Sequence, residues 1–184
     1  MDAHNARTNF IFGGARSGKS QFAETLCHES DCDLLYVATS PVIKGDAEYA
    51  DRIKMHQDRR GPRWRVIEEE LALAEILKAE SRPDLAILID CMTLWLNNVL
   101  YHNLSLEDRL KAFIDAMQTC QSRIILISNE VGQGIVPSNP EVRGFRDHQG
   151  RLNQTLAAHC DRVIEVRAGL PLILKPNQQP AITL

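Results

Sequence analysis

The stretch Gly13-Gly14-Ala15-Arg16-Ser17-Gly18-Lys19-Ser20 matches the pattern G-x-x-x-x-G-K-[ST] at every fixed position. A short apolar run at 10–12 precedes it, and a helical pattern at 20–28 follows it. In this context successive backbone N–H groups curl around one anion, and the positive end of the helix dipole faces the same point. The sequence therefore predicts a loop that binds the phosphates of a nucleoside triphosphate. An ordinary glycine-rich turn is the less favoured interpretation.

Three residues in and near this loop have the chemistry that phosphate transfer needs. Lys19 is placed to put a positive charge on the β- and γ-phosphates, and the Ser20 hydroxyl is a ligand for Mg²⁺. Asp90 ends the apolar run 85–89, and an acid at the carboxyl end of a parallel strand lies where open α/β sheets bind ligands. We therefore expect Asp90 to hold magnesium or to contact the nucleotide. The alternative is an N-cap for the segment 92–100.

Glu130 has an equivalent position after the apolar run 124–127, and Gly132 and Gly134 follow it. A glycine-containing loop at this place indicates a mobile or tightly packed edge of the site. Glu130 is a candidate for orienting an acceptor hydroxyl or a metal-bound water. A simple surface acid on a loop is the alternative.

Apolar runs alternate with helical patterns along the chain. The expected strands are 10–12, 34–38, 85–89, 124–127, 163–166 and 172–174. The expected helices are 20–28, 48–57, 71–79, 106–119 with Ser105 as N-cap, and 151–159. This alternation predicts a doubly wound α/β fold, with a mostly parallel sheet and helices on both faces. The last two strands lie too close in sequence for a parallel crossover, which predicts a C-terminal antiparallel hairpin.

The composition narrows the class of protein. The chain has 184 residues, 44% of them hydrophobic and 24% charged, which suits one domain over 1–184. A net charge of -3 argues against a nucleic-acid partner, and every apolar run falls short of the ~20 residues of a membrane span. Five scattered cysteines and an N-terminus without a signal-peptide pattern favour a cytoplasmic protein with reduced thiols.

His56 is the second chemical candidate. Arginines surround it in sequence, among them Arg52, Arg59 and Arg60, and such surroundings favour a neutral imidazole beside bound phosphate. A neutral imidazole there can attack phosphorus and form a covalent phosphoramidate. From spacing alone, a structural histidine on a helix face is the more common case. The basic run that continues to Arg65 is either a solvated face or an anion-binding rim.

Together these motifs resemble those of the bifunctional adenosylcobinamide kinase/adenosylcobinamide-phosphate guanylyltransferase family (CobU/CobP) of cobalamin biosynthesis. The resemblance covers residues 10–175. Beyond the phosphate loop it includes Tyr36-Val37-Ala38-Thr39-Ser40, Arg52-Ile53-x-x-His56, the segment 64–68, Asp90-Cys91-Met92-Thr93-Leu94-Trp95, Asn129-Glu130-Val131-Gly132-x-Gly134-Ile135-Val136-Pro137, Phe145-Arg146-Asp147 and Gly150-Arg151-Leu152-Asn153-Gln154. Many kinases share the loop alone, whereas the ordered set is far more specific.

The resemblance implies two reactions in sequence. ATP or GTP first phosphorylates the aminopropanol hydroxyl of adenosylcobinamide. GMP then passes from GTP to that phosphate through a guanylylated histidine, which gives adenosylcobinamide-GDP and pyrophosphate. The matching histidine is His56, and Met55 stands where a related enzyme has a second histidine.

The resemblance also implies a RecA-like fold of the P-loop NTPases and a homotrimer. It extends the expected nucleotide contacts beyond the phosphate loop. The added positions are Ala38, Thr39, Ser40, Arg60, Gly61, Pro62, Arg63, Glu68 and Asp90.

Two other functions remain open from the sequence. A monofunctional small-molecule kinase would use the same loop without guanylylation of His56. A non-catalytic nucleotide-sensing module would show little turnover that depends on an acceptor, and the absence of a basic groove interleaved with aromatic residues disfavours it.

Overall fold

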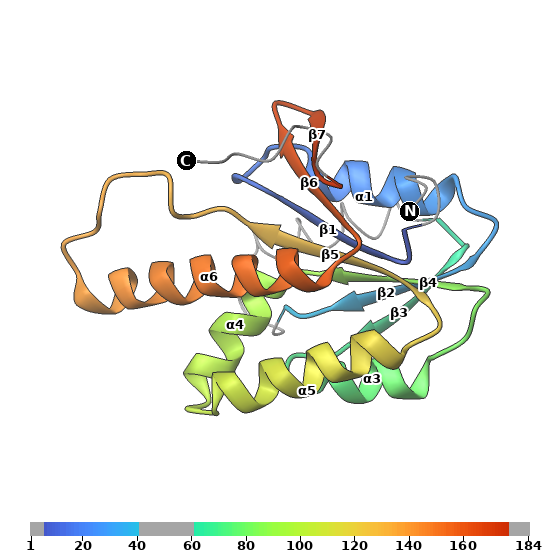
Figure 1. Ribbon diagram of the computed structural model, residues 1–184, viewed down its shortest axis with the longest axis horizontal. Helices are drawn as coiled ribbons and strands as arrows, with labels where there is room; N and C mark the ends of the chain where they lie inside the picture. Colours follow the sequence, from blue (N-terminus) through green and yellow to red (C-terminus); the bar gives the residue numbers. More distant parts are fainter. Residues whose placement is uncertain (1–5, 41–60, 177–184) are drawn as a thin grey trace, which may run out of the picture.

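The computed structural model describes residues 6–40 and 61–176. These residues build one seven-stranded sheet in the order β3-β2-β4-β5-β1-β6-β7 (Figure 1). The strands are β1 (Thr8–Gly13), β2 (Asp33–Ala38), β3 (Trp64–Glu68), β4 (Leu85–Asp90), β5 (Arg123–Asn129), β6 (Arg162–Arg167) and β7 (Leu170–Lys175). All neighbours pair in parallel except β6 and β7, which pair antiparallel. The predicted parallel sheet and C-terminal hairpin are confirmed.

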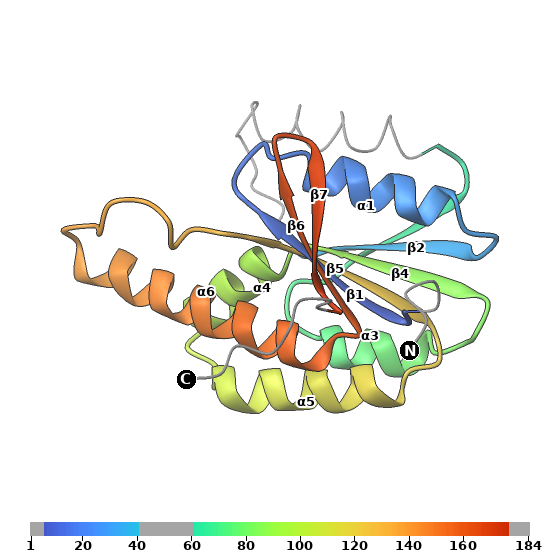
Figure 2. The same cartoon turned by 45° about the horizontal axis from the view of Figure 1, so that its top comes forward.

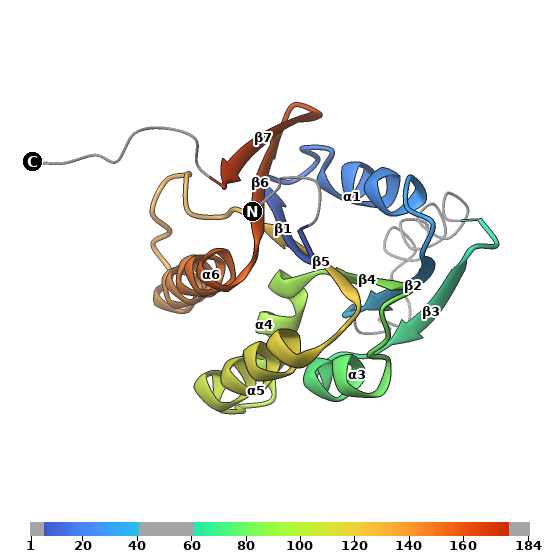
Figure 3. The same ribbon diagram turned by 45° about the vertical axis from the view of Figure 1, so that its right-hand side comes forward.

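Helices cover both faces of the sheet (Figure 3). They are α1 (Lys19–His28), α3 (Leu73–Ala79), α4 (Met92–Tyr101), α5 (Leu106–Thr119) and α6 (Pro140–His159). Helix α1 lies on one face, and the other four lie on the opposite face, where α3 and α5 run side by side (Figure 2). This two-sided cover agrees with the doubly wound fold that the sequence predicts.

Strand alternation divides the core between these two faces. On β1, Phe10 belongs to the cluster under α3, α4, α5 and α6, whereas Ile11 belongs to the cluster under α1. On β4, Ile87 and Leu88 divide in the same way, and both are fully buried. Because both faces of the central strands are covered, these strands read as continuous apolar runs in the sequence.

Three elements differ from the sequence-based expectation. Helix α4 was not among the expected helices, because the segment 92–100 was considered only as one that Asp90 would cap. Strand β3 was not predicted, and α6 begins at Pro140 and not near residue 151. The first half of α6 extends past the sheet (Figures 1 and 2), so it has no long apolar stripe to reveal it. The predicted Ser105 cap of α5 is confirmed, since the Ser105 hydroxyl accepts a hydrogen bond from the Asp108 N–H at 3.2 Å.

The expected helix at 48–57 lies outside the described residues, and the single domain over 1–184 stays a prediction. Among residues 6–40 and 61–176, no helix is both long enough and apolar enough to cross a bilayer.

Candidate nucleotide-binding site

The parallel register brings the predicted site residues to one edge of the sheet. Gly13 pairs with Asn129, and Asp90 pairs with both Ile127 and Ala38. The carboxyl ends of β1, β5, β4 and β2 therefore lie next to one another, which is where open α/β sheets bind ligands. We call this the carboxyl edge.

The phosphate loop joins β1 to α1 at this edge. The Ser17 N–H donates to the Gly14 carbonyl at 3.2 Å, and the Phe22 N–H donates to the Gly18 carbonyl at 2.9 Å. Gly14, Ala15 and Arg16 are exposed at the crest of the loop. The first N–H groups of α1 have no acceptor within the helix, so the loop and the helix start together offer donors to an anion.

Lys19 and Ser20 begin α1 directly after this loop. The Lys19 ammonium lies over the loop, where it donates to the Gly14 carbonyl at 3.2 Å. Both side chains are half-buried. Both residues therefore lie at the start of the helix that follows the loop, and their roles toward phosphate and Mg²⁺ stay predictions.

Two glycines of the loop are required by its shape. A Cβ atom on Gly13 would lie 2.3 Å from the Val166 carbonyl oxygen and 2.8 Å from Ser17 Oγ. Gly18 has φ of +96°, a conformation that side chains disfavour. The Gly169 N–H donates to the Ser17 carbonyl at 2.8 Å, so the β6–β7 hairpin fixes the loop from behind.

Asp90 lies at the end of β4, with β5 between it and the phosphate loop. Its Oδ2 accepts a hydrogen bond from the Tyr36 hydroxyl at 3.0 Å. Asp90 is not the N-cap of α4, because Cys91 occupies that position. Burial, with a smaller effect of Asp90, raises the pKa of the Cys91 thiol to about 11, so this thiol is neutral at neutral pH.

Thr39, which was expected to contact nucleotide, is fully buried. Its hydroxyl accepts from the Cys91 N–H at 2.7 Å and donates to the Cys91 carbonyl at 2.8 Å. Its own carbonyl accepts from the Asn98 side chain at 2.8 Å. The Thr39 side chain therefore holds the end of β2 against the residue after Asp90. Ala38 and Ser40 flank it at the same edge and are half-buried.

Glu130 lies beside the start of the phosphate loop. Its N–H donates to the Gly13 carbonyl at 3.0 Å, and its carboxylate accepts from the Gly132 N–H. The Arg146 guanidinium in turn donates to the Gly132 carbonyl. The Glu130 side chain is half-buried, and its hydrogen bond to the loop holds it in place. A simple surface acid would not be held in this way.

A buried polar network behind this edge was not predicted. The Gln149 amide donates to Ser128 Oγ at 2.9 Å and to Asn153 Oδ1 at 2.8 Å, and Ser128 Oγ also donates to Asn153 Oδ1 at 2.8 Å. The Asn153 amide donates to the Asn129 carbonyl at 3.1 Å, and Thr93 Oγ1 accepts from the Asn129 N–H at 2.8 Å. The network ties α6 and α4 to the residue before Glu130. The sequence feature that could have indicated this network is the pair Gln149 and Asn153, which lie four residues apart on one face of α6.

The segment 61–68 divides between the two edges. Glu68 ends β3, where it is exposed and pairs with Ala38 at the carboxyl edge. Arg63 precedes β3 at the opposite edge, together with exposed Gly61 and Pro62. The Arg63 guanidinium donates to the carbonyls of His28, Ser30 and Cys32 at 2.9–3.1 Å. The structure thus brings Glu68, but not residues 61–63, to the edge of the phosphate loop. His56 and Arg60 lie outside the described residues.

Magnesium ligation by Ser20 and Asp90 agrees with the donors at this edge. Within 6–40 and 61–176 no group of three or more His, Cys, Asp or Glu side chains is placed to hold a metal ion. Mg²⁺ bound with a nucleotide usually has one or two carboxylates, phosphate oxygens and water as ligands. One hydroxyl and one carboxylate beside a phosphate loop fit that pattern.

A phosphate loop at the carboxyl edge of a mostly parallel sheet defines a P-loop nucleotide-binding protein. The fold has solved counterparts among ATPases. The chain is similar to the type III secretion ATPase EscN of enteropathogenic Escherichia coli, with a TM-score of 0.51 and 11% identity over 89% of this chain. It covers 43% of that ATPase, and the likeness concerns the fold alone.

The chain belongs to the cobinamide kinase/cobinamide phosphate guanyltransferase family, whose model matches residues 9–174. It is 43% identical to the bifunctional adenosylcobalamin biosynthesis protein CobP of Pseudomonas aeruginosa, over 91% of this chain and 96% of that protein. It is 38% identical to CobU of Salmonella typhimurium, over 90% of this chain and 98% of that protein. These matches confirm the resemblance drawn from the motifs, and with it the prediction of a cobalamin-biosynthesis kinase and guanylyltransferase.

Proposed function

We propose that the carboxyl edge holds one nucleoside triphosphate at a time and serves both reactions of the family. The observation that carries this proposal is the phosphate loop flanked by Asp90 and Glu130 at one edge of the sheet. Phosphoryl transfer depends mainly on positioning and charge stabilisation. The loop amides and Lys19 supply both for a triphosphate tail.

In the kinase reaction, the loop and Lys19 hold the β- and γ-phosphates of ATP or GTP. Glu130 accepts the proton of the acceptor hydroxyl as that oxygen attacks the γ-phosphorus and the nucleoside diphosphate leaves. Ser20 and Asp90 would hold Mg²⁺ at the phosphates. When bound, this ion neutralises the charge that develops during transfer. Ala38, Ser40 and Glu68, at the same edge, extend the nucleotide site.

In the guanylyltransferase reaction, a ring nitrogen of His56 attacks the α-phosphorus of GTP and pyrophosphate leaves. The phosphate of adenosylcobinamide phosphate then attacks the same phosphorus, which releases the imidazole and forms adenosylcobinamide-GDP. Support for His56 comes from the family motif, since this residue lies outside the described part of the chain. Arg60 is proposed to contact the nucleotide on the same ground. Gly61, Pro62 and Arg63 are expected to do so as well on the ground of the resemblance, although the Arg63 guanidinium already donates to three carbonyls at the amino edge.

The test uses GTP labelled at the α-phosphorus. Wild-type protein is expected to retain a label that is acid-labile and alkali-stable, and His56→Ala is expected to lose it while it keeps kinase activity. His159→Ala, an exposed histidine at the end of α6, is the matched control and should label like the wild type. A kinase that retains no label would support the monofunctional alternative. A protein that binds GTP but never turns over with acceptor would support the nucleotide-sensing alternative.

We also propose a homotrimer in the cytoplasm. The family resemblance supports the trimer, and β7 has exposed apolar side chains, Leu170, Leu172 and Ile173, at the sheet edge that suit contact between copies. Five free cysteines are consistent with a reducing compartment. Light scattering coupled to gel filtration measures the mass in solution directly. A monomeric mass at micromolar concentration would contradict the trimer.

A further inference from the structure

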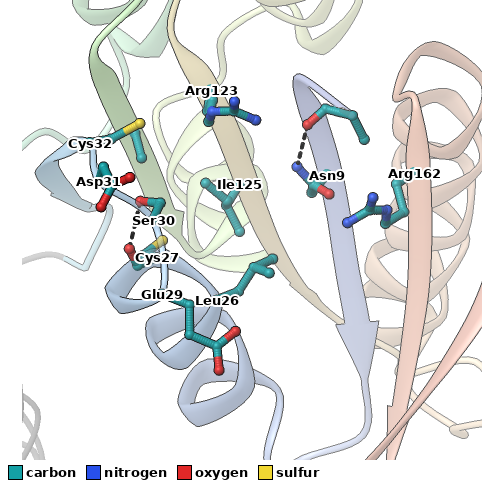
Figure 4. A pocket seen from close by; sticks show the side chains of 12 residues that line it. Asn9, Leu26, Cys27, Glu29, Ser30, Asp31, Cys32, Arg123, Ile125 and Arg162 are labelled. Atoms are coloured by element: carbon teal, nitrogen blue, oxygen red, sulfur yellow. Dashed lines mark hydrogen bonds between the residues drawn. The ribbon is translucent and has the colours of Figure 1, made fainter. Parts of the chain in front are cut away.

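A cavity of about 550 Å³ lies at the amino edge of the sheet, opposite the phosphate loop (Figure 4). Its floor is formed by the first residues of strands, among them Arg123 of β5, Asn9 of β1 and Arg162 of β6. Its cover is the last turn of α1 and the loop after it, from Leu26 to Cys32. The volume is in the range of small-molecule sites.

Two guanidinium groups enter this cavity from strands on either side of β1. Asn9 of β1 pairs with Arg162 of β6 on one side and with Ile125 of β5 on the other. Arg123 lies two residues before Ile125, so its side chain is on the same face of the sheet. Neighbouring strands are about 4.8 Å apart and two residues along a strand span about 6.6 Å, so the Cα atoms of the two arginines lie roughly 12 Å apart, a span that two long side chains can close around one anion.

Neither guanidinium is paired with an acceptor within residues 6–40 and 61–176. No hydrogen bond or ion pair in those ranges involves the guanidinium of Arg123 or Arg162, and Arg162 Nε is buried without a partner. The other arginines of this edge differ: Arg63 donates to carbonyls, and Arg82 pairs with Asp33 and Asp84. Two guanidinium groups without a paired acceptor, at a cavity that Glu29 and Asp31 also line, indicate a place for a small anion.

Asn9 adds an independent observation. Asn9 is only 5% exposed. It lines the cavity between the two arginines (Figure 4). Its amide group donates to the Ala6 carbonyl at 3.4 Å, but its Oδ1 has no hydrogen-bond partner. Buried polar atoms are nearly always paired. Asn9 Oδ1 lacks a donor, and the nearby guanidinium groups of Arg123 and Arg162 lack an acceptor. A ligand with both an anionic group and a polar hydrogen would satisfy all three.

We propose that this cavity binds a small organic anion. A carboxylate or phosphate group lies between Arg123 and Arg162, and a hydroxyl or amino hydrogen of the same ligand is donated to Asn9 Oδ1. Glu29 and Asp31 at the rim repel highly charged ligands, so the site selects a singly or doubly charged anion over a nucleoside triphosphate. Guanidinium side chains bind the anion here, whereas the phosphate loop offers backbone N–H groups.

The test is a titration of ¹⁵N-labelled full-length protein, with inorganic phosphate in one arm and D-glycerate, a hydroxycarboxylate, in the other. The Asn9 side-chain amide and the Arg162 Nε–H report on the cavity, and the amides of Gly14 and Ser17 report on the phosphate loop. We expect saturable shifts of the cavity signals with at least one probe, and these shifts should persist in Lys19→Ala. The arm with the tighter binding identifies the anionic group.

Three variants and one control decide the result. Arg123→Gln and Arg162→Gln should each weaken cavity binding about tenfold or more, because each removes a charged donor. Asn9→Asp should abolish binding by adding a negative charge. Arg167→Gln is the control, since it removes an exposed charge of β6 that pairs with Glu165 outside the cavity, and it should bind within about twofold of the wild type.

Two outcomes would overturn the proposal. One is the absence of saturable cavity shifts with either probe up to about 50 mM, a concentration that corresponds to negligible affinity. The other is binding that Arg123→Gln leaves unchanged, which would place the anion elsewhere. Arg123 is half-exposed at a strand start, so this variant keeps the test valid if Arg162→Gln does not fold.

Discussion

The carboxyl and amino edges of the sheet use polar residues in opposite ways. At the amino edge, most polar side chains bind backbone groups of neighbouring elements. The Arg63 guanidinium donates to three carbonyls, one from the last residue of α1 and two from the loop that follows, and Ser122 Oγ donates to the carbonyls of Glu80 and Arg82. At the carboxyl edge, the phosphate loop exposes its crest, and Asp90 and Glu130 stand at its sides. Both edges tie strand ends together, as Thr39 and Asn153 do at the carboxyl edge, but the carboxyl edge also has an exposed loop that is left to bind a ligand. The cavity near Asn9 is the exception at the amino edge.

Removing the charge of the phosphate loop is expected to have the largest effect. Lys19→Ala should lower kcat/KM of both reactions by about 10²–10³-fold, because a preorganised positive charge at the triphosphate is lost. The midpoint of thermal unfolding should change little, since Lys19 lies at the start of α1, beside the exposed crest of the loop. Steady-state assays with acceptor and labelled nucleotide measure the first quantity, and calorimetry measures the second.

Lys111→Ala is the matched control for this prediction. Lys111 is exposed on α5, away from the loop, and its removal should leave both rates unchanged. A Lys19→Ala protein that retains activity within tenfold of the wild type would contradict the role of the carboxyl edge.

Gly13→Ala tests how tightly the loop is held from behind. The added Cβ would lie 2.3 Å from the Val166 carbonyl oxygen, which is backbone and cannot move away easily. We expect a loss of about 2–3 kcal/mol in the free energy of unfolding, as for overpacked sites, measured by urea denaturation. Gly14→Ala is the control, because a Cβ there meets no atom within 4 Å. Equal stability of the two variants would show that the hairpin does not fix the loop.

The sequence predicted the fold well where apolar periodicity was continuous. Buried strands such as β4 read as unbroken hydrophobic runs, and the short connection between β6 and β7 required a hairpin. It failed at β3, where Arg65 and Val66 are exposed and mask the strand pattern. The sequence analysis also missed the start of α6, because that part of the helix has no long apolar stripe. Asn139 as N-cap and Pro140 in the first turn were the signals of a helix start that could have revealed it.

The sequence predicted those parts of the site that follow from the parallel direction of the strands. Acids that follow parallel strands must gather at the carboxyl edge, so Asp90 and Glu130 lie where they were expected. The position of Arg63 at the amino edge was not predicted, because a basic run gives no indication of the edge on which it lies, and its contact with nucleotide stays a prediction. The network around Ser128 and Asn153 was missed, since its members bind one another only after α6 packs on β5.

Breaking the network around Ser128 and Asn153 should lower the free energy of unfolding by no more than Gly13→Ala does. Asn153→Ala removes the acceptor of the Ser128 hydroxyl and the side-chain donor to the Asn129 carbonyl, at a cost of about 1–3 kcal/mol. The Glu130 N–H, bonded to the Gly13 carbonyl, should then exchange faster with deuterium, because the strand end is less well held. Gln154→Ala, exposed on the same helix, is the control. If hydrogen exchange at the Glu130 N–H is unchanged in Asn153→Ala, the network does not hold Glu130 in place.

The smallest effect is expected at the amino edge, where Asp161 joins β6 to β1. Its carboxylate accepts from the Arg7 N–H at 3.0 Å and from the N–H and hydroxyl of Thr8 at 2.9 Å each. Burial alone would raise the pKa of Asp161, but these hydrogen bonds and the Arg7 charge lower it overall. A lowered pKa in the folded state stabilises the protein above the unfolded value of about 3.9, and this contribution is lost as the pH falls below it.

Asp161→Asn should therefore cost about 1 kcal/mol at pH 7, a value kept small because the residue is exposed and solvent screens its charge. The difference from the wild type should shrink as the pH falls below about 4, since the wild-type carboxylate then becomes protonated. Urea unfolding at several pH values measures this, with Asp115→Asn, an exposed acid of α5, as the control. A difference that stays constant at every pH would assign the stabilisation to hydrogen-bond geometry and not to the charge of Asp161.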